Sequence, residues 1–150
     1  MRLGIANTTI LIALCAYSMP GSGQNSLKNG TPASICIASK DLVNTDLFGA
    51  WSLLLEGGGS SVVTRLQLLR NPEFAESLAG SYAVNDKKFE VFGDIEEGAF
   101  DLEETANGAD ISAIWKGRVA EGSCGQTILG TRRNVANNTE QSFVLRRPGW

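Results

Sequence analysis

The sequence predicts an all-β protein, a small antiparallel up-and-down β-barrel of about eight strands with a flexible N-terminal arm. The chain of 150 residues contains 17 glycines, and turn residues separate its short apolar runs at a spacing typical of all-β folds. Within each run apolar residues alternate with polar ones, so only one face of the sheet is apolar. Such a sheet closes most economically on itself, because closure leaves no open edge. A two-sheet sandwich is the alternative.

Turn residues divide the organised part of the chain into eight predicted strands. The run from Phe89 to Ile95 alternates cleanly, because Glu90 and Asp94 fall on the face opposite its apolar residues. Asn107-Gly108 is the strongest hairpin signal, since both residues tolerate positive φ. Glycines in the inward phase give a tightly coiled barrel room, and they are Gly80, Gly93, Gly117 and Gly130. The predicted strands are residues 47–55, 62–70, 78–84, 89–95, 100–104, 111–117, 124–133 and 143–147.

The N-terminus has the pattern of a secretion signal. Arg2 supplies a basic start, residues 10–17 are apolar, and small residues allow cleavage near residue 18 or 23. The apolar stretch is too short for a membrane span, so we expect no integral membrane segment. A lipid anchor at Cys15 is the alternative, although Leu14 stands where a small residue is wanted. The predicted organisation is a signal peptide at 1–23, an arm at 24–46 and the barrel at 47–150 of a periplasmic or secreted protein.

The three cysteines predict one disulfide if the protein is exported. Removal of the signal peptide would take Cys15 with it and leave Cys36 and Cys124. An even number of cysteines in an oxidising compartment implies a bridge. That bridge would pin the arm across the barrel, because Cys36 precedes the strands and Cys124 opens a late one. Two free buried thiols are the alternative if export fails.

The composition excludes several classes of function. The chain has no histidine, which removes Ser-His-Asp and Cys-His catalysis and every zinc site that needs imidazole. No nucleophile motif is present either, so we expect no enzyme, no catalytic residue, no metal and no cofactor. A net charge of −3 argues against nucleic acid as a partner, because proteins that bind nucleic acid carry a basic face.

Nine acidic residues lie between Asp86 and Asp110. Alternation turns Glu90, Asp94 and Glu96 outward, so a solvated hairpin face is the default interpretation. A docking face for a basic partner is one alternative. A weak calcium site is another, and its ligands would be Asp94, Glu96 and Glu97.

Four arginines form two pairs in the last two predicted strands. If these strands form a hairpin, Arg132-Arg133 lies beside its turn and Arg146-Arg147 lies at the far end. The two pairs therefore do not merge into one basic patch, and each end of the barrel carries at most a positive spot. The candidate ion-pair partners are Glu103, Glu104 and Glu140.

Three short motifs occur in a recognisable order. Gly49-Ala50-Trp51 is similar to the G-x-W of small ligand-binding barrels, residues 78–82 (LAGSY) to an L-x-G-x-Y, and Trp115-Lys116-Gly117 to a later W-x-G. From Leu47 to Arg147 the chain thus resembles calycin-type barrels, namely the lipocalin, avidin and bacterial metalloprotease-inhibitor families. Against avidins, the resemblance would make Tyr82 a hydrogen-bonding and Trp115 a ring-stacking residue of a biotin pocket. Leu53 and Val84 replace polar biotin ligands there, so the resemblance supports the architecture and not biotin binding.

Trp51, Tyr82 and Trp115 are the candidate ligand-binding residues. They would give a cavity flat apolar walls and one orienting phenol, unless they fill the core of a narrow barrel instead. We expect an exported non-enzymatic binding module for a small ligand or a protein partner. The alternative is an inhibitor of a secreted or periplasmic hydrolase, a protease or lysozyme, that acts through the N-terminal arm. An open cavity beside Trp51 and Trp115 would favour the ligand binder, whereas an inhibitor can have a filled barrel.

Overall fold

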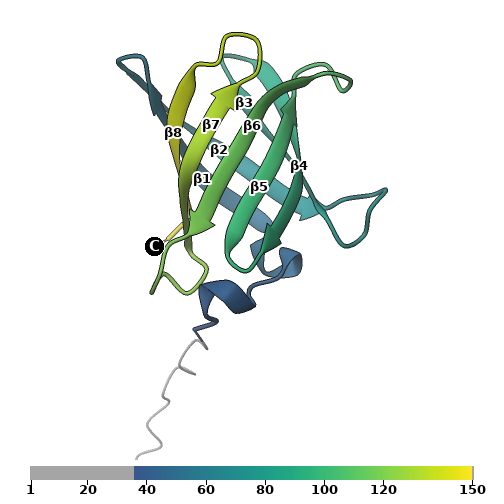
Figure 1. Cartoon of the computed structure of the whole chain (residues 1–150), viewed down its shortest axis with the longest axis vertical. Coiled ribbons are helices and arrows are strands. Elements are labelled where there is room, and N and C mark those ends of the chain that lie inside the picture. Colours follow the sequence, from purple (N-terminus) through teal and green to yellow (C-terminus); the bar gives the residue numbers. More distant parts are fainter. Residues whose placement is uncertain (1–35, 150) are drawn as a thin grey trace, which may run out of the picture. The chain divides into compact units, whose positions relative to one another are not determined.

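Eight antiparallel strands close into one barrel in the computed structural model, which describes residues 36–149 (Figure 1). Each strand pairs with the next along the chain, and β8 pairs with β1 from Ser52↔Arg146 to Glu56↔Ser142. This closed meander confirms the predicted fold class over the two-sheet sandwich. The strands are β1 (Gly49–Gly57), β2 (Ser60–Arg70), β3 (Leu78–Val84), β4 (Lys87–Glu96), β5 (Ala99–Thr105), β6 (Ile111–Val119), β7 (Thr127–Asn134) and β8 (Glu140–Arg146).

The connections between strands form two ends that differ in structure (Figure 1). The hairpin end holds the turns at 58–59, 85–86, 106–110 and 135–139. Gly58-Gly59 and Asn85-Asp86 have positive φ at both residues, which matches the right-handed twist of the flanking strands. The opposite end, called the helical end here, holds two short 3₁₀ helices, η1 (Ser39–Asp41) and η2 (Asn44–Leu47), with the connections at 71–77, 97–98 and 120–126.

Asn107-Gly108 lies in the hairpin connection between two consecutive antiparallel strands, as the sequence predicts. It lies inside the five-residue connection between β5 and β6, where Gly108 has a φ of 78°. The side-chain oxygen of Asn107 accepts the backbone N–H groups of Ala109 and Asp110 at 3.0 and 2.9 Å. This side-chain turn replaces backbone bonds of a tight hairpin, and such competition is characteristic of asparagine.

The prediction that Cys124 opens a strand is wrong. Cys124 lies in the connection at 120–126 with a φ of 52°, and β7 begins at Thr127. Two successive turns occupy this connection, because the Ser123 N–H bonds the Ala120 carbonyl and the Gln126 N–H bonds the Ser123 carbonyl. The disulfide is therefore attached to a turn at the helical end and leaves the sheet ladder undisturbed.

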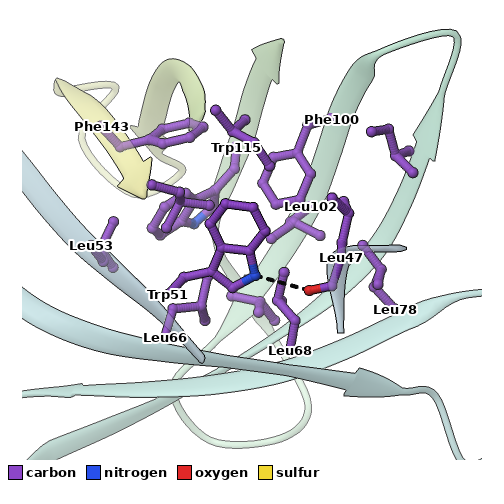
Figure 2. Packing of buried hydrophobic residues seen from close by; sticks show 14 of the residues in the cluster. Leu47, Trp51, Leu53, Leu66, Leu68, Leu78, Phe100, Leu102, Trp115 and Phe143 are labelled. Atoms are coloured by element: carbon purple, nitrogen blue, oxygen red, sulfur yellow. Dashed lines mark hydrogen bonds between the residues drawn. The ribbon is translucent and has the colours of Figure 1, made fainter. Parts of the chain in front are cut away.

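Large apolar side chains from all eight strands fill the inside of the barrel (Figure 2). Phe143 is the central aromatic contact, with ring centroids 4.9 Å from Trp115 and 6.3 Å from Phe100. Such spacings are those of packed aromatic pairs and leave no room for a ligand between the rings. The fully buried side chains are Trp51, Trp115, Phe100, Phe143, Leu47, Leu53, Leu66, Leu68, Leu78, Leu102, Ile128 and Leu145.

Two paired glycines make room for Phe143. Gly117 of β6 and Gly130 of β7 are cross-strand partners, and both face inward. A Cβ on Gly117 would lie 2.7 Å from Cζ of Phe143, and one on Gly130 would lie 2.7 Å from Cε1 of the same ring. Gly117 and Gly130, two of the four inward glycines predicted from the alternation, are therefore needed to accommodate the Phe143 ring.

We expect Gly130→Ala to lower the free energy of unfolding by about 1–3 kcal/mol, the usual cost of overpacking a dense core. The added methyl would collide with the Lys116 carbonyl oxygen and lie 2.6 Å from the Cα of Gly117. Urea unfolding followed by near-UV circular dichroism measures the change. Thr131→Ala, on the exposed face of the same strand, is the control and should stay within about 0.5 kcal/mol of the wild type. An unchanged Gly130→Ala variant would contradict the packing described.

The segment before β1 covers the helical end of the barrel. Cys36 forms the predicted disulfide with Cys124, with a Cα–Cα distance of 4.7 Å. Leu42 and Leu47 insert into the core with 5% and 0% of their surface exposed. Residues 36–46, which the sequence assigns to the arm, therefore pack against the barrel. The predicted signal peptide, Cys15 and arm residues 24–35 lie outside the described residues. No helix among residues 36–149 is long and apolar enough to cross a membrane.

Replacing Cys36 and Cys124 by serine should lower the free energy of unfolding by about 4–5 kcal/mol in the chain-entropy account of disulfides. The two residues are 88 positions apart, so the bond removes a long loop from the unfolded ensemble. Equilibrium unfolding of the double variant should match that of the reduced wild type. Titration of the exported protein with a thiol reagent should find no free cysteine, and finding two would contradict the bridge.

Candidate functional site

The three residues predicted to bind a ligand are part of the packed interior. Trp51 and Trp115 have no exposed surface, and Tyr82 is 4% exposed. Tyr82 and Trp115 make an edge-to-face contact with centroids 5.8 Å apart, and Tyr82 also stacks on Phe89 at 5.0 Å. Trp51 turns its polar edge toward the helical end, where its indole N–H donates to the Leu47 carbonyl at 2.9 Å (Figure 2). All three therefore follow the core-filling alternative.

A buried carboxylate, Glu104, organises the polar groups at the hairpin end of the interior. The Tyr82 hydroxyl donates to its Oε2 atom at 2.7 Å, and the Trp115 indole N–H donates to the same atom at 2.9 Å. Arg132 approaches with two bonds, from Nε to Oε2 at 2.8 Å and from Nη2 to Oε1 at 2.6 Å. The Ser112 hydroxyl donates to Oε1 at 2.9 Å. Glu104 is 1% exposed, and its two oxygens are saturated with donors.

The charges of this cluster are mutually stabilised. Burial alone would raise the pKa of Glu104, but hydrogen bonds from Arg132 and Tyr82 outweigh it and hold that pKa below its ordinary value. Burial is also the main reason that the pKa of Tyr82 lies far above its ordinary value, with the charge of Glu104 adding to it. Burial would lower the pKa of Arg132, but the hydrogen bond to Glu104 reverses the direction. The cluster is thus an ionised Glu–Arg pair with a neutral phenol.

This arrangement suits a structural role better than a chemical one. A general acid or base must reach a substrate proton, and the Glu104 carboxylate is enclosed by its own donors. Every buried side-chain nitrogen and oxygen among residues 36–149 has a hydrogen-bond partner, so no unpaired polar group points into the interior to receive a ligand. The remaining Arg132 contact, from Nη1 to Oε1 of Gln141 at 3.0 Å, joins the cluster to β8.

We expect Glu104→Gln to lower the free energy of unfolding by about 3–5 kcal/mol, because it leaves the buried guanidinium of Arg132 without its counter-charge. Chemical denaturation of the variant and the wild type measures the change. Glu103→Gln is the matched control, since Glu103 is the exposed neighbour on the same strand and should matter little. Equal effects of the two substitutions would contradict the buried pair.

The stabilisation of the fold by the Glu104 carboxylate depends on pH, and the Glu104→Gln variant measures this dependence. The folded-state pKa lies below the ordinary value of 4.5, so the carboxylate stabilises the fold at neutral pH. That stability is lost as the pH falls from the ordinary value through the lower folded-state pKa. The free-energy difference between wild type and Glu104→Gln should therefore shrink below about pH 4.5. A difference that stays constant in acid would contradict the ionised pair.

Glu104 differs from the solvated acids with which the sequence groups it. It is one of the three candidate ion-pair partners of the arginines, and it pairs with Arg132 inside the barrel. Its position was nonetheless readable, because Phe100, Leu102 and Glu104 share one phase of β5 and all three are buried. Arg132 occupies the same inward phase of β7 as Ile128. A charged residue in the apolar phase of two strands is the signal of a buried ion pair.

The second arginine pair lies at the opposite end, as the sequence predicts. The guanidinium of Arg147 stacks over the Trp51 ring, with its Cζ atom 4.3 Å from the ring centroid. Its two terminal nitrogens donate to the carbonyls of Phe48 at 2.8 Å and Asp46 at 2.6 Å. Arg147 therefore ties the segment before β1 to the end of β8. Burial lowers the pKa of this guanidinium.

Two hollows lie on the outer surface of the barrel. A groove of about 870 Å³ crosses the outer face of β4, β5 and β6 between the connection at 71–77 and the turn at Gly108. A neighbouring hollow of about 580 Å³ shares Asp94 and Asp101 with it. The alternative interpretation of Asp94, Glu96 and Glu97 as a calcium site finds no support, because no three metal-ligating side chains cluster within the described part of the chain. Asp94 and Glu96 face outward, as the alternation predicts.

Comparison of the sequence with protein-family profiles and with curated proteins finds no match. The eight-stranded antiparallel meander is the architecture of calycin-type barrels, so the resemblance holds at the level of the fold. The interior does not repeat a ligand pocket at the three residues that the motifs singled out, because these side chains pack on one another and on the core.

Proposed function

We propose that this protein is an exported, non-enzymatic module that binds a protein partner through the outside of its barrel. The filled interior is the observation that carries the proposal. Trp51 and Trp115 have no exposed surface, and their indole N–H groups are bonded to Leu47 and Glu104. A small ligand needs a concave site with open walls and free polar groups, and the space beside these residues offers neither. Binding through the outer surface is what remains for a chain of this size.

The chemistry of the side chains supports a non-enzymatic role. The chain has no histidine, and Glu104, its most deeply buried acid, is held ionised by donors from within the barrel. Export is supported by the disulfide, because such bonds persist in oxidising compartments. This bond and the predicted signal peptide support a periplasmic or secreted location.

A titration with small ligands tests the proposal. The Trp150→Phe variant keeps only the two interior tryptophans, so its emission reports on the core alone. We expect no saturable change in emission and no rise in melting temperature with fatty acids, biotin or apolar dyes, because the core has no vacancy. A saturable change that Tyr82→Phe abolishes would place a ligand in the barrel and overturn the proposal.

A hydrolase inhibitor acting through the N-terminal arm is the second candidate. It is favoured by the anchoring of Cys36, because the disulfide to Cys124 gives the chain before it a fixed point of departure. The mature chain and a chain beginning at Ser34 are compared as inhibitors of secreted proteases and lysozymes. Inhibition by the mature chain alone would support this candidate, whereas equal inhibition by both would locate the contact on the barrel.

A further inference from the structure

Two aromatic side chains of the outer groove are exposed. Phe74, in the connection at 71–77, is 65% exposed, and Phe92 of β4 is 37% exposed. Both line the groove. The apolar surface continues along the sheet, because Phe92 is the cross-strand neighbour of Ala79, and Ala79 that of Leu69, which is 54% exposed. Exposed aromatic clusters of this kind mark interaction sites more often than chance surface residues do.

The connection that carries Phe74 is held in one conformation. Asn71 is 7% exposed, and its side-chain oxygen accepts the N–H groups of Glu73 at 2.9 Å and Phe74 at 3.2 Å. The Ser77 N–H closes the turn on the Phe74 carbonyl at 2.8 Å. Asn44 of η2 adds a donor to the Glu76 carbonyl. An exposed aromatic on so constrained a loop loses little conformational entropy when a partner covers it.

Carboxylates surround these aromatics. In the sheet, Glu103 stands between Phe92 and Ile114, and Asp101 stands between Asp94 and Lys116 in the next row. Among residues 36–149, Lys116 is the single cation that lines the groove, and it pairs with Asp101 at 2.9 Å, with both side chains exposed. The other acids of the groove, Glu73, Asp94 and Glu103, make no ion pair with any residue in 36–149.

We propose that this groove docks a basic segment of the protein partner, with an apolar side chain seated between Phe74 and Phe92 and with lysines or arginines facing Glu73 and Glu103. The inference rests on the proposed function and adds the site and the chemistry of the partner. The unpaired acids of the groove favour a cationic partner, and the rings of Phe74 and Phe92 give an apolar side chain a surface on which it loses its water. A foreign basic segment fits better than a second copy of this chain, because each copy carries a net charge of −3.

Short synthetic peptides test the inference on the exported protein. One carries a Trp-Leu centre flanked by lysine and arginine, the second has glutamate flanks, and the third keeps the basic flanks but has a serine centre. We expect saturable binding of the first peptide only, weakening as salt is added, because exposed charges are screened. Amide chemical shifts should change at Phe74, Phe92 and Glu103 and not at Val63 on the opposite wall.

Matched variants locate the contact. Phe74→Ala should weaken binding of the basic apolar peptide about tenfold, the effect of removing an anchor residue. Glu73→Gln with Glu103→Gln should weaken it severalfold and reduce its salt dependence. The controls change one exposed apolar side chain and one exposed acid outside the groove. They are Val63→Ala, at a side chain 72% exposed, and Glu56→Gln, at an exposed acid of β1. Neither should change the affinity.

The remaining outcomes overturn the inference. Equal binding of all three peptides, or binding that Phe74→Ala leaves unchanged, would remove the groove as the site. A concentration-dependent dimer that Phe74→Ala dissolves would make a second copy the occupant instead. If a protein partner binds the module with the groove variants unaffected, the groove is wrong and the proposed function stands. If the Trp150→Phe titration finds a ligand in the core while the basic peptide still binds the groove, the proposed function fails alone.

Discussion

Closure of eight strands into a narrow barrel dictates most of what is seen in this protein. Every inward side chain is enclosed by the sheet, so it must either pack against its neighbours or find a polar partner inside. Apolar residues from all eight strands meet the first condition. The paired Gly117 and Gly130 have no side chains there, because the Phe143 ring takes the space of two side chains. Without closure the same strands would expose an apolar face.

At each end of the barrel, an arginine guanidinium serves as the polar partner of groups that turn inward. At the hairpin end, Arg132 neutralises Glu104, and this carboxylate also accepts hydrogen bonds from the Tyr82 hydroxyl and the Trp115 indole N–H. At the helical end, Arg147 lies over Trp51 and bonds the backbone of the segment before β1. A buried ion pair of this kind is weak evidence of stability by itself, but removing one partner is costly because the other charge stays buried. The arginines thus close the interior at both ends.

Because the interior is filled, the surface accessible to a partner lies on the outside of the barrel. Loops held by a rigid sheet are the usual carriers of binding, because the sheet bears the cost of order while the loops vary. Here the connection at 71–77 projects Phe74 over a wall of carboxylates, and Asn71 and Asn44 hold it there. The disulfide fixes the position of Cys36 at the helical end of the barrel.

The alternation of apolar and polar residues along the chain predicts most of the fold. The alternation of apolar and polar residues, the turn residues between runs and the inward glycines are local properties, so they predict the strand count and the orientation of most acids and favour a closed meander over a sandwich. The cysteine count predicts the bridge on the condition that the signal peptide is removed. Local turn chemistry was less decisive. Cys124 lies in a turn and does not open a strand, because successive turns compete with strand pairing at strand ends.

The alternation along each strand identifies the residues that turn inward, whereas the packing of distant strands on one another decides what those residues meet inside the barrel. Trp51, Tyr82 and Trp115 could equally have lined a cavity or filled a core, since inward phase is the same in both. The choice depends on how side chains far apart in the chain share one volume. Glu104 and Arg132, 28 positions apart, became a buried pair for the same reason. The groove likewise joins the 71–77 connection to three later strands, a juxtaposition that exists only once the sheet has closed.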